Sequence, residues 1–245
     1  MEASARQAQA RSFGPAADLY DRVRPRYPIE AIRWILGDRP LTVVDLGAGT
    51  GILTRQLVGI GYEPIPVEPD PGMRRRLGET GGAPDALDGS AEAIPLPDAS
   101  VDAVVAGQAY HWFDHERAHA EIARVLKPGG VFGPLWNDRD DQVPWIAALS
   151  EIVDDDQSSG VQVAPLGPLF TPLEQATFRH AVRQTPQTLL ELVRSRSFYL
   201  TAAPARRAEV DTAVRELCAT HPDLAGRDEF DLPYVTYAFR ARRAS

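Results

Sequence analysis

The first half of the chain alternates between short apolar runs and stretches whose apolar positions recur at helical spacing. Residues 41–46, LTVVDL, are almost wholly apolar and rich in β-branched side chains, which is typical of a buried parallel strand. Residues 28–38 before this run and residues 52–60 after it both show the helical spacing. We therefore expect a helix, a buried strand, a glycine-rich turn and a second helix in succession.

The same alternation continues as far as residue 137. The further elements expected there are a strand at 62–68, a helix at 69–79, a short strand at 86–88, a strand at 100–110, a helix at 114–126 and a strand at 131–137. Asp114 is the expected N-cap of the last helix, and the KPGG stretch at 127–130 is its expected stop. Strands that alternate with helices in this way predict βα units and a parallel sheet.

Beyond residue 137 the pattern weakens. The elements expected in this part are helices at 140–156, 187–197 and 206–220 and strands at 175–185 and 232–243. The stretch at 158–172 is rich in Gly, Pro and Ser and is expected to be a loop. We expect this loop to contribute to a substrate lid.

Composition and charge narrow the classes of function. A length of 245 residues favours a single domain at 1–245 over two small ones. A formal net charge of -8 without a cluster of Lys and Arg disfavours nucleic acid as a partner. No apolar run reaches the length of a membrane span, the N-terminus lacks the apolar core of a signal peptide, and Cys218 has no second cysteine to pair with. These features predict a cytoplasmic protein without a membrane partner.

A glycine cluster directly follows the first buried strand. The run at 45–51, DLGAGTG, stands between strand and helix, and Glu68 ends the next expected strand. Glycines let such a turn tighten and let a ligand approach the backbone, while the helix behind them presents free N–H groups. An acidic residue one βα unit later can accept hydrogen bonds from both hydroxyls of a ribose. Because Ile52 stands where a dinucleotide fingerprint has its third glycine, a pyrophosphate-binding site is less favoured.

Five motifs, in order along the chain, carry a family resemblance. They are YDRVRPRYP, VVDLGAGTG, VEPDPGM, GSAEAIPLPDASVDAVVAGQAYHWFD and EIARVLKPGG. In these motifs the sequence resembles the class I S-adenosylmethionine-dependent methyltransferases, especially the small-molecule group that includes ubiquinone-type and trans-aconitate methyltransferases. The resemblance implies S-adenosyl-L-methionine as cofactor and a small molecule as methyl acceptor. Together with the alternation above, it predicts an α/β, Rossmann-like sheet of seven strands, mostly parallel, with helices on both faces, an antiparallel last strand and lid segments.

The resemblance also implies which residues hold the cofactor. Asp45, Gly47 and Gly49 would cradle its methionine portion, and Glu68 would hold the ribose. Gln108, at the end of a strand, would offer its backbone carbonyl to the amino group of the cofactor. The residues expected around the adenine ring are Pro69, Met73, Ser90, Ala91 and Glu92.

The segment before the first helix is expected to fold over the cofactor, as such segments do in the similar family. Tyr20 and Arg24 would then lie beside the cofactor, and Arg24 would pair with a carboxylate of the cofactor or of the acceptor. The alternative is that Arg22, Arg24 and Arg26 form a solvated surface stripe. The domain would comprise an N-terminal lid at about 10–28, a core at about 29–137, and a second lid with the last two strands at about 138–245.

Methyl transfer is an in-line displacement, so the protein has mainly to align the acceptor and exclude water. His111 follows a strand where the ligand crevice of such a sheet opens, and it is the candidate general base for a hydroxyl or amine acceptor. Packing beside the cofactor is the alternative role, because a carboxylate or enolate acceptor needs no base. The residues expected to line the acceptor pocket are Tyr27, Trp112, Trp136 and Asn137. Aromatic residues without a basic cluster favour a small acid or hydroxyl compound as acceptor.

A competing motif occurs at 115–119, where HERAH matches the helical zinc signature H-E-x-x-H. Taken alone, it indicates a zinc metallohydrolase. The downstream G-x-x-H extension is missing, and Glu121 lies too close in sequence to resemble the usual third ligand. We therefore expect no metal and instead a helix that packs Ala118 and Ile122 against the sheet. A protein that binds S-adenosylmethionine without turnover is the remaining alternative.

Overall fold

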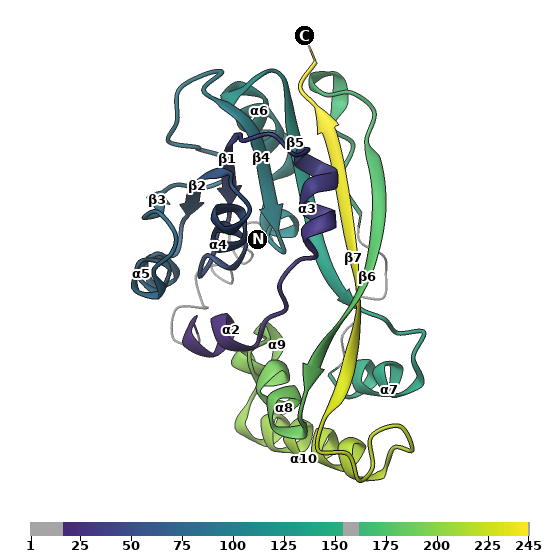
Figure 1. Ribbon diagram of the computed structural model, residues 1–245. Helices are drawn as coiled ribbons and strands as arrows, with labels where there is room; N and C mark the ends of the chain where they lie inside the picture. The colour runs from purple at the N-terminus through teal and green to yellow at the C-terminus, as the bar shows by residue number, and fades with distance from the viewer. Residues whose placement is uncertain (1–16, 154–161, 245) are drawn as a thin grey trace.

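The centre of the protein is a seven-stranded sheet (Figure 1). The computed structural model describes residues 17–153 and 162–244. The strands are β1 (Thr42–Leu46), β2 (Glu63–Glu68), β3 (Leu87–Asp88), β4 (Val101–Gly107), β5 (Leu126–Arg139), β6 (Glu174–Gln184) and β7 (Phe230–Arg242). They lie in the order β3-β2-β1-β4-β5-β7-β6, and all neighbours pair in parallel except that β7 is antiparallel to β5 and β6. The expected mostly parallel sheet with an antiparallel last strand is confirmed.

Helices cover both faces of the sheet, because alternate residues of a strand point to opposite sides. Val44 of β1 faces the side that is covered by α6 (His115–Val125). Its neighbour Val43 faces the side that is covered by α3 (Ile29–Leu36) and α4 (Ile52–Gly59). The expected arrangement of helices on both faces is thus confirmed.

A second group of helices, the helical cap, lies beyond the carboxyl ends of β1 and β4 (Figure 1). Its members are α2 (Ala17–Val23), α7 (Pro144–Ile152), α8 (Pro186–Arg194), α9 (Ser197–Thr201) and α10 (Pro204–Thr220). The cap has its own apolar core, which includes Trp145, Leu189 and Val214, and the ends of β6 and β7 extend into it (Figure 1). Ligands of open α/β sheets bind at the carboxyl ends of the strands, so the cap covers the expected crevice.

Several element boundaries differ from those expected. β4 ends at Gly107 instead of residue 110, because Gln108 adopts a positive φ of 54° and the chain turns into a 3-10 helix, η2 (Tyr110–Trp112). The fifth strand is longer than 131–137: the KPGG stretch ends α6 as expected but then belongs to β5. The helix expected at 187–197 ends at Arg194 and is followed by the separate helix α9.

The two lid segments differ in part from the structure expected for them. α2 was not predicted, because its seven residues are too few to show a clear helical period. The expected loop at 158–172 contains the short 3-10 helix η4 (Gly167–Leu169). The parts of these predictions at 10–16, 154–156 and 158–161 lie outside the described residues. Within the described residues, no helix combines the length and the apolar character that crossing a bilayer requires.

Candidate active site

The glycine-rich turn joins β1 to α4 through three glycines with positive φ. The φ values are 72° at Gly47, 57° at Gly49 and 85° at Gly51. Residues other than glycine rarely adopt such positive values. A Cβ built on Gly47 would lie 2.7 Å from Cβ of Ala109, which follows β4. Glycine is therefore required at residue 47 for the carboxyl ends of β1 and β4 to approach one another.

Glu68 is a buried carboxylate that joins this turn to the end of β2. Only 6% of the residue is exposed. Its Oε2 accepts a hydrogen bond of 2.9 Å from the N–H of Gly49, and its Oε1 accepts one of 2.8 Å from the N–H of Asp70. Burial raises the pKa of Glu68 to about 7, although the two backbone hydrogen bonds act in the opposite direction. The carboxylate is thus oriented at the turn before any ligand arrives.

Asp45, at the end of β1, is the second buried carboxylate of the turn. Its Oδ2 accepts a hydrogen bond of 2.6 Å from Oγ1 of Thr54 on α4. Burial raises the pKa of Asp45 to about 6, and the hydrogen bonds from Thr54 partly offset that effect. Sequence reasoning missed Thr54. The available signal was a polar residue between Leu53 and Leu57, on the buried stripe of the helix.

The residues expected at the adenine ring gather where the chain leaves β2 and β3. Met73 and Ala91 are buried, whereas Pro69 and Ser90 are half-buried. The backbone groups of Ser90 pair with those of Ala93. Glu92 lies in the loop between β3 and β4 and accepts a hydrogen bond of 2.9 Å from the N–H of Asp114 at the start of α6. Its side chain therefore orients this loop.

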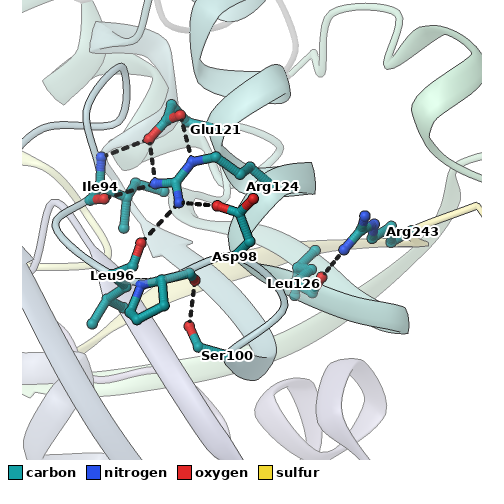
Figure 2. Close-up of polar contacts among 9 residues, drawn as sticks. Ile94, Leu96, Asp98, Ser100, Glu121, Arg124, Leu126 and Arg243 are labelled. Atoms are coloured by element: carbon teal, nitrogen blue, oxygen red, sulfur yellow. Dashed lines mark hydrogen bonds and ion pairs between the residues drawn. The ribbon is translucent and has the colours of Figure 1, made fainter.

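Arg124 of α6 fixes the loop that follows Glu92 (Figure 2). Its guanidinium donates hydrogen bonds to the backbone carbonyls of Ile94 and Leu96, at 2.9 and 2.8 Å, and to the carboxylate of Asp98. It also forms a two-pronged ion pair with Glu121, whose Oε2 accepts from the N–H of Ile94 as well (Figure 2). The carboxylate of Glu121 therefore helps to hold the loop between β3 and β4 against α6.

Gln108 is bound to β5 by its side chain. Its Nε2 donates to the carbonyl of Asn137 at 3.1 Å, and its Oε1 accepts from the N–H of Asn137 at 3.0 Å. The side-chain amide thus replaces a backbone pair at the point where the positive φ ends β4. Because the side chain turns toward β5, the backbone carbonyl is the group of Gln108 that suits the role expected toward the cofactor.

Asn137 holds the N-terminal segment against the sheet. Its Nδ2 donates to the carbonyls of Pro25 and Arg26, at 3.4 and 3.1 Å, and its Oδ1 accepts from Oγ1 of Thr236 at 2.6 Å. Only 7% of Asn137 is exposed. The residue lies at the expected edge of the sheet, but its amide serves contacts within the protein.

Tyr27 lies in the same segment, over the end of β4. Its backbone N–H and carbonyl pair with the side-chain amide of Gln56 on α4, at 2.9 and 2.7 Å. A Cβ built on Gly107 would lie 2.7 Å from the hydroxyl of Tyr27, so the ring packs directly on the end of β4. Burial raises the pKa of Tyr27, and the charge of Asp45 acts in the same direction. Tyr27 is therefore buried over the carboxyl end of β4, and its contact with an acceptor stays a prediction.

Arg24 connects the N-terminal segment to the cap. Its guanidinium lies 4.6 Å from the ring centre of Tyr20 and donates to the carbonyl of Ser195 at 3.3 Å. Its Nε is buried and has no hydrogen-bond partner within the described part of the chain. Burial lowers the pKa of Arg24, and the charge of Arg196 adds to the effect. Arg24 thus stacks on Tyr20 of α2 where the N-terminal segment meets the end of α8, and the contact of both residues with a cofactor stays a prediction.

His111, Trp112 and Trp136 meet at the ends of β4 and β5. Nε1 of Trp136 donates to Nδ1 of His111 at 3.4 Å, and the rings of His111 and Trp112 have centres 4.6 Å apart. His111 is an exposed residue. Desolvation of its ring by the surrounding protein nevertheless lowers its pKa to about 4, with smaller contributions from the charges of Arg196 and His115. The imidazole is therefore neutral at pH 7.

The H-E-x-x-H motif forms a packed network around Tyr110. Nε2 of His119 is 2.9 Å from the hydroxyl of Tyr110, and Nε2 of His115 is 3.3 Å from the carbonyl of Tyr110. The same hydroxyl accepts from the N–H of Ala164 at 3.1 Å. Among the described residues, no group of three or more His, Cys, Asp or Glu side chains is placed to hold a metal ion. The imidazole nitrogens that zinc would need serve internal hydrogen bonds, which argues against a zinc site.

Comparison with known proteins connects this geometry to a family. A family profile described as a methyltransferase domain matches residues 44–133. An uncharacterised methyltransferase of Mycobacterium bovis is 44% identical over 239 residues, which are 98% of this chain and 98% of the relative. A solved structure of a proposed type II methyltransferase from Anaeromyxobacter dehalogenans has a TM-score of 0.60 at 24% identity, covering 90% of this chain and 97% of that one.

A further structural neighbour was solved with ligands. It is a phosphoethanolamine N-methyltransferase of Haemonchus contortus in complex with phosphomonomethylethanolamine and S-adenosylhomocysteine. Its TM-score is 0.53 at 15% identity, and the match covers 95% of this chain and 58% of that one. The fold and the glycine-rich turn define an α/β enzyme of the class I methyltransferase type. The chain belongs to the family of S-adenosylmethionine-dependent methyltransferases.

Proposed function

We propose that the chain binds S-adenosyl-L-methionine at the carboxyl ends of β1, β2 and β4 and transfers its methyl group to a small-molecule acid or hydroxyl compound. The observation that carries the proposal is the buried carboxylate of Glu68, held against the glycine-rich turn by the N–H of Gly49. The presence of S-adenosylhomocysteine in a protein of the same fold supports it.

The chemistry of the turn fits this cofactor. Within the described residues, and apart from the chain neighbours of Gly49, no heavy atom lies within 4 Å of a Cβ built on it, so a ligand can approach the backbone there. Burial raises the pKa of Asp45, and none of the ion pairs among the described residues involves this carboxylate, so the ammonium group of a methionine moiety would supply a cationic partner. The second lone pair on each oxygen of Glu68 can accept a ribose hydroxyl.

Other residues are proposed to complete the cofactor site. Arg24 would bind the carboxylate of the methionine moiety, and Tyr20 would hold Arg24 in place by stacking. The backbone carbonyl of Gln108 would accept from the ammonium group. The residues proposed around the adenine ring are Pro69, Met73, Ser90, Ala91 and Glu92, of which Glu92 would act by orienting the loop.

The acceptor is proposed to lie against His111, Trp112, Trp136 and Tyr27. When bound, S-adenosylmethionine supplies an electrophilic methyl group on a cationic sulfur. Aromatic faces nearby stabilise that cation and exclude water. His111 is neutral at pH 7, and the basic nitrogen of its ring is Nδ1, which accepts from Nε1 of Trp136. A hydroxyl acceptor would give its proton to Nδ1 by taking the place of that indole N–H, whereas a carboxylate acceptor needs no such step. We infer that Asn137 positions the lid and does not touch the acceptor, because both ends of its amide have internal partners.

Two measurements test this function. Calorimetry with S-adenosylmethionine and S-adenosylhomocysteine should give one site per chain. A screen of small carboxylic acids, phenols, alcohols and amines with methyl-labelled cofactor should then show transfer to at least one acid or hydroxyl compound. Efficient labelling of tRNA or of a folded protein, with no labelling of the small molecules, would contradict the proposed substrate class.

A further inference from the structure

A cavity of about 460 Å³ lies between α2, the segment that follows it and α4. From α4 it is lined by Ile52, Arg55, Gln56 and Gly59. The buried stripe of α4, which includes Leu53 and Leu57, faces the sheet instead. The cavity is therefore on the outer side of α4. Of the described residues assigned to the proposed cofactor site, Arg24 alone lines the cavity, whereas Asp45, Glu68 and Gln108 do not.

Arginine dominates the charge of this cavity. Among the described residues, the lining includes four arginines, Arg22, Arg24, Arg26 and Arg55, against a single acidic residue, Asp21. This concentration is unusual because the chain as a whole has a formal net charge of -8. Arginine binds carboxylate and phosphate oxygens through two parallel N–H groups, and it is only weakly hydrated compared with lysine.

The ion pairs within the protein leave an excess of positive charge. Arg55 is paired with Asp21 and also donates to the hydroxyl of Thr80 at 2.8 Å. Arg22 donates to Glu191 of α8 at 2.9 Å, in a pair whose arginine is 66% exposed. Arg24 donates to a backbone carbonyl, which neutralises no charge. Even when Glu191 is included, the described part of the chain has four cations at this cavity against two anions.

We propose that this cavity binds a small polyanion, a compound that carries two or more carboxylate or phosphate groups. Such a ligand would bridge Arg22 and Arg26 across the mouth of the cavity and approach Arg55 at its wall. The arginines at residues 22, 24 and 26 all line this cavity. A polyanion bound there would neutralise the repulsion between their like charges.

The ligand would also hold α2 in place. α2 is tied to α8 by the pair of Arg22 with Glu191, to α5 (Pro71–Thr80) by the pair of Asp18 with Arg76 at 3.1 Å, and to α4 by Asp21. Since Arg24 lies at both the cavity and the proposed cofactor site, occupancy of one site should change affinity at the other by the same factor.

Calorimetry at constant ionic strength tests the proposal, with inorganic pyrophosphate and citrate as separate probes for phosphate and carboxylate groups. We expect saturable binding of at least one probe at one site per chain. Arg22→Gln and Arg26→Gln should each weaken that binding by about tenfold or more, as loss of one charged hydrogen bond implies. Arg75→Gln, which removes an exposed arginine of α5 outside the cavity, is the matched control and should bind as the parent does.

Two outcomes would overturn the proposal: no saturable binding of either probe, or equal weakening by the Arg75 variant, which would indicate general attraction to positive charge. Arg22→Gln and Arg26→Gln change exposed side chains, and their melting temperatures should match the parent in the absence of probe. Neither residue is assigned to the cofactor site, and the assay requires no methyl transfer. Failure of this proposal would therefore be distinct from failure of the proposed methyltransferase site.

Discussion

The N–H of Gly49 donates a hydrogen bond of 2.9 Å to Oε2 of Glu68, which is 19 residues further along the chain. This bond joins the glycine-rich turn after β1 to the end of β2. The strands β1 and β2 pair side by side in the sheet. A carboxylate held in this way cannot rotate freely, so a ligand that binds it does not have to immobilise the side chain. The bond also places a titratable group with a pKa of about 7 directly beside the proposed cofactor.

We expect the affinity for S-adenosylmethionine to increase as the pH rises from about 6 to about 8. The ionised Glu68 accepts more hydrogen bonds than the protonated form, and its pKa of about 7 places the change in this range. Glu68→Gln should weaken binding about 10- to 100-fold at pH 8, as loss of a charged hydrogen bond implies, and flatten the pH dependence. Calorimetry measures both effects, with Glu79→Gln on the exposed side of α5 as control. A pH dependence unchanged in Glu68→Gln would contradict the assignment.

Thr54→Val should weaken cofactor binding although Thr54 touches no ligand in the proposal. The variant preserves the shape of the side chain but removes the donor at 2.6 Å from Asp45, so the pKa of Asp45 should rise above its value of about 6. A larger neutral fraction of Asp45 at pH 7 would attract the methionine ammonium less. Thr54→Ser retains the hydroxyl and should restore both the affinity and its pH profile. Equal affinity in the valine and serine variants would show that this hydrogen bond has only a structural role.

Asn137→Ala should destabilise the fold and loosen the N-terminal segment. The substitution leaves the hydroxyl of Thr236 without its partner, at roughly 1–3 kcal/mol for a buried polar group, and it removes the donor to the partly buried carbonyl of Arg26, which should cost less. Urea unfolding measures the loss of free energy, and calorimetry should show weaker cofactor binding, because Arg24 and Tyr27 belong to the released segment. Thr236→Val removes one hydrogen bond of the same amide and should have the smaller effect on cofactor binding. The opposite order would place the effect in the β5–β7 pair and not in the lid.

His111→Ala should reduce the rate about 10²- to 10⁴-fold with a hydroxyl acceptor, the range for loss of a general base, and much less with a carboxylate acceptor. Because the pKa of His111 is about 4, the parent enzyme should show no loss of rate from protonation of this residue between pH 6 and 8. Trp136→Phe retains an aromatic ring and removes the donor to Nδ1, so it separates the packing of the pocket from the orientation of the imidazole. Equal losses with both acceptor classes would indicate that His111 acts by packing.

The stability supplied by His119 should decrease as the pH falls from about 6.5 toward 4. Burial lowers the pKa of the folded-state imidazole to about 4, so within this range the unfolded chain binds a proton that the folded chain does not. The difference in unfolding free energy between the parent and His119→Ala should thus be larger at pH 7.5 than at pH 5, as urea titrations can show. Methyl transfer should be nearly retained in the variant. One zinc ion per chain, lost in His119→Ala, would restore the metallohydrolase interpretation.

Local patterns in the sequence were sufficient to predict the framework. The apolar run ending in Asp45 and the glycines at 47, 49 and 51 indicate a strand, a tight turn and a helix, because strand and helix periods and positive φ are properties of neighbouring residues. The spacing to Glu68 follows from one βα unit. The seven strands were therefore predicted, whereas their ends were displaced where a single residue departs from the pattern, as Gln108 does.

The tertiary structure decided how side chains that are distant along the chain are used. Asn137 was expected to face the acceptor, but the folded chain brings Arg26, 111 residues before it, and Thr236, 99 residues after it, within hydrogen-bond distance. The two histidines of H-E-x-x-H have the spacing of zinc ligands, and Tyr110 determines that they form internal hydrogen bonds. Periodicity specifies which face of an element is buried, but not which polar groups from other elements meet there. Those partners depend on where strand ends and lids converge, which is a property of the whole fold.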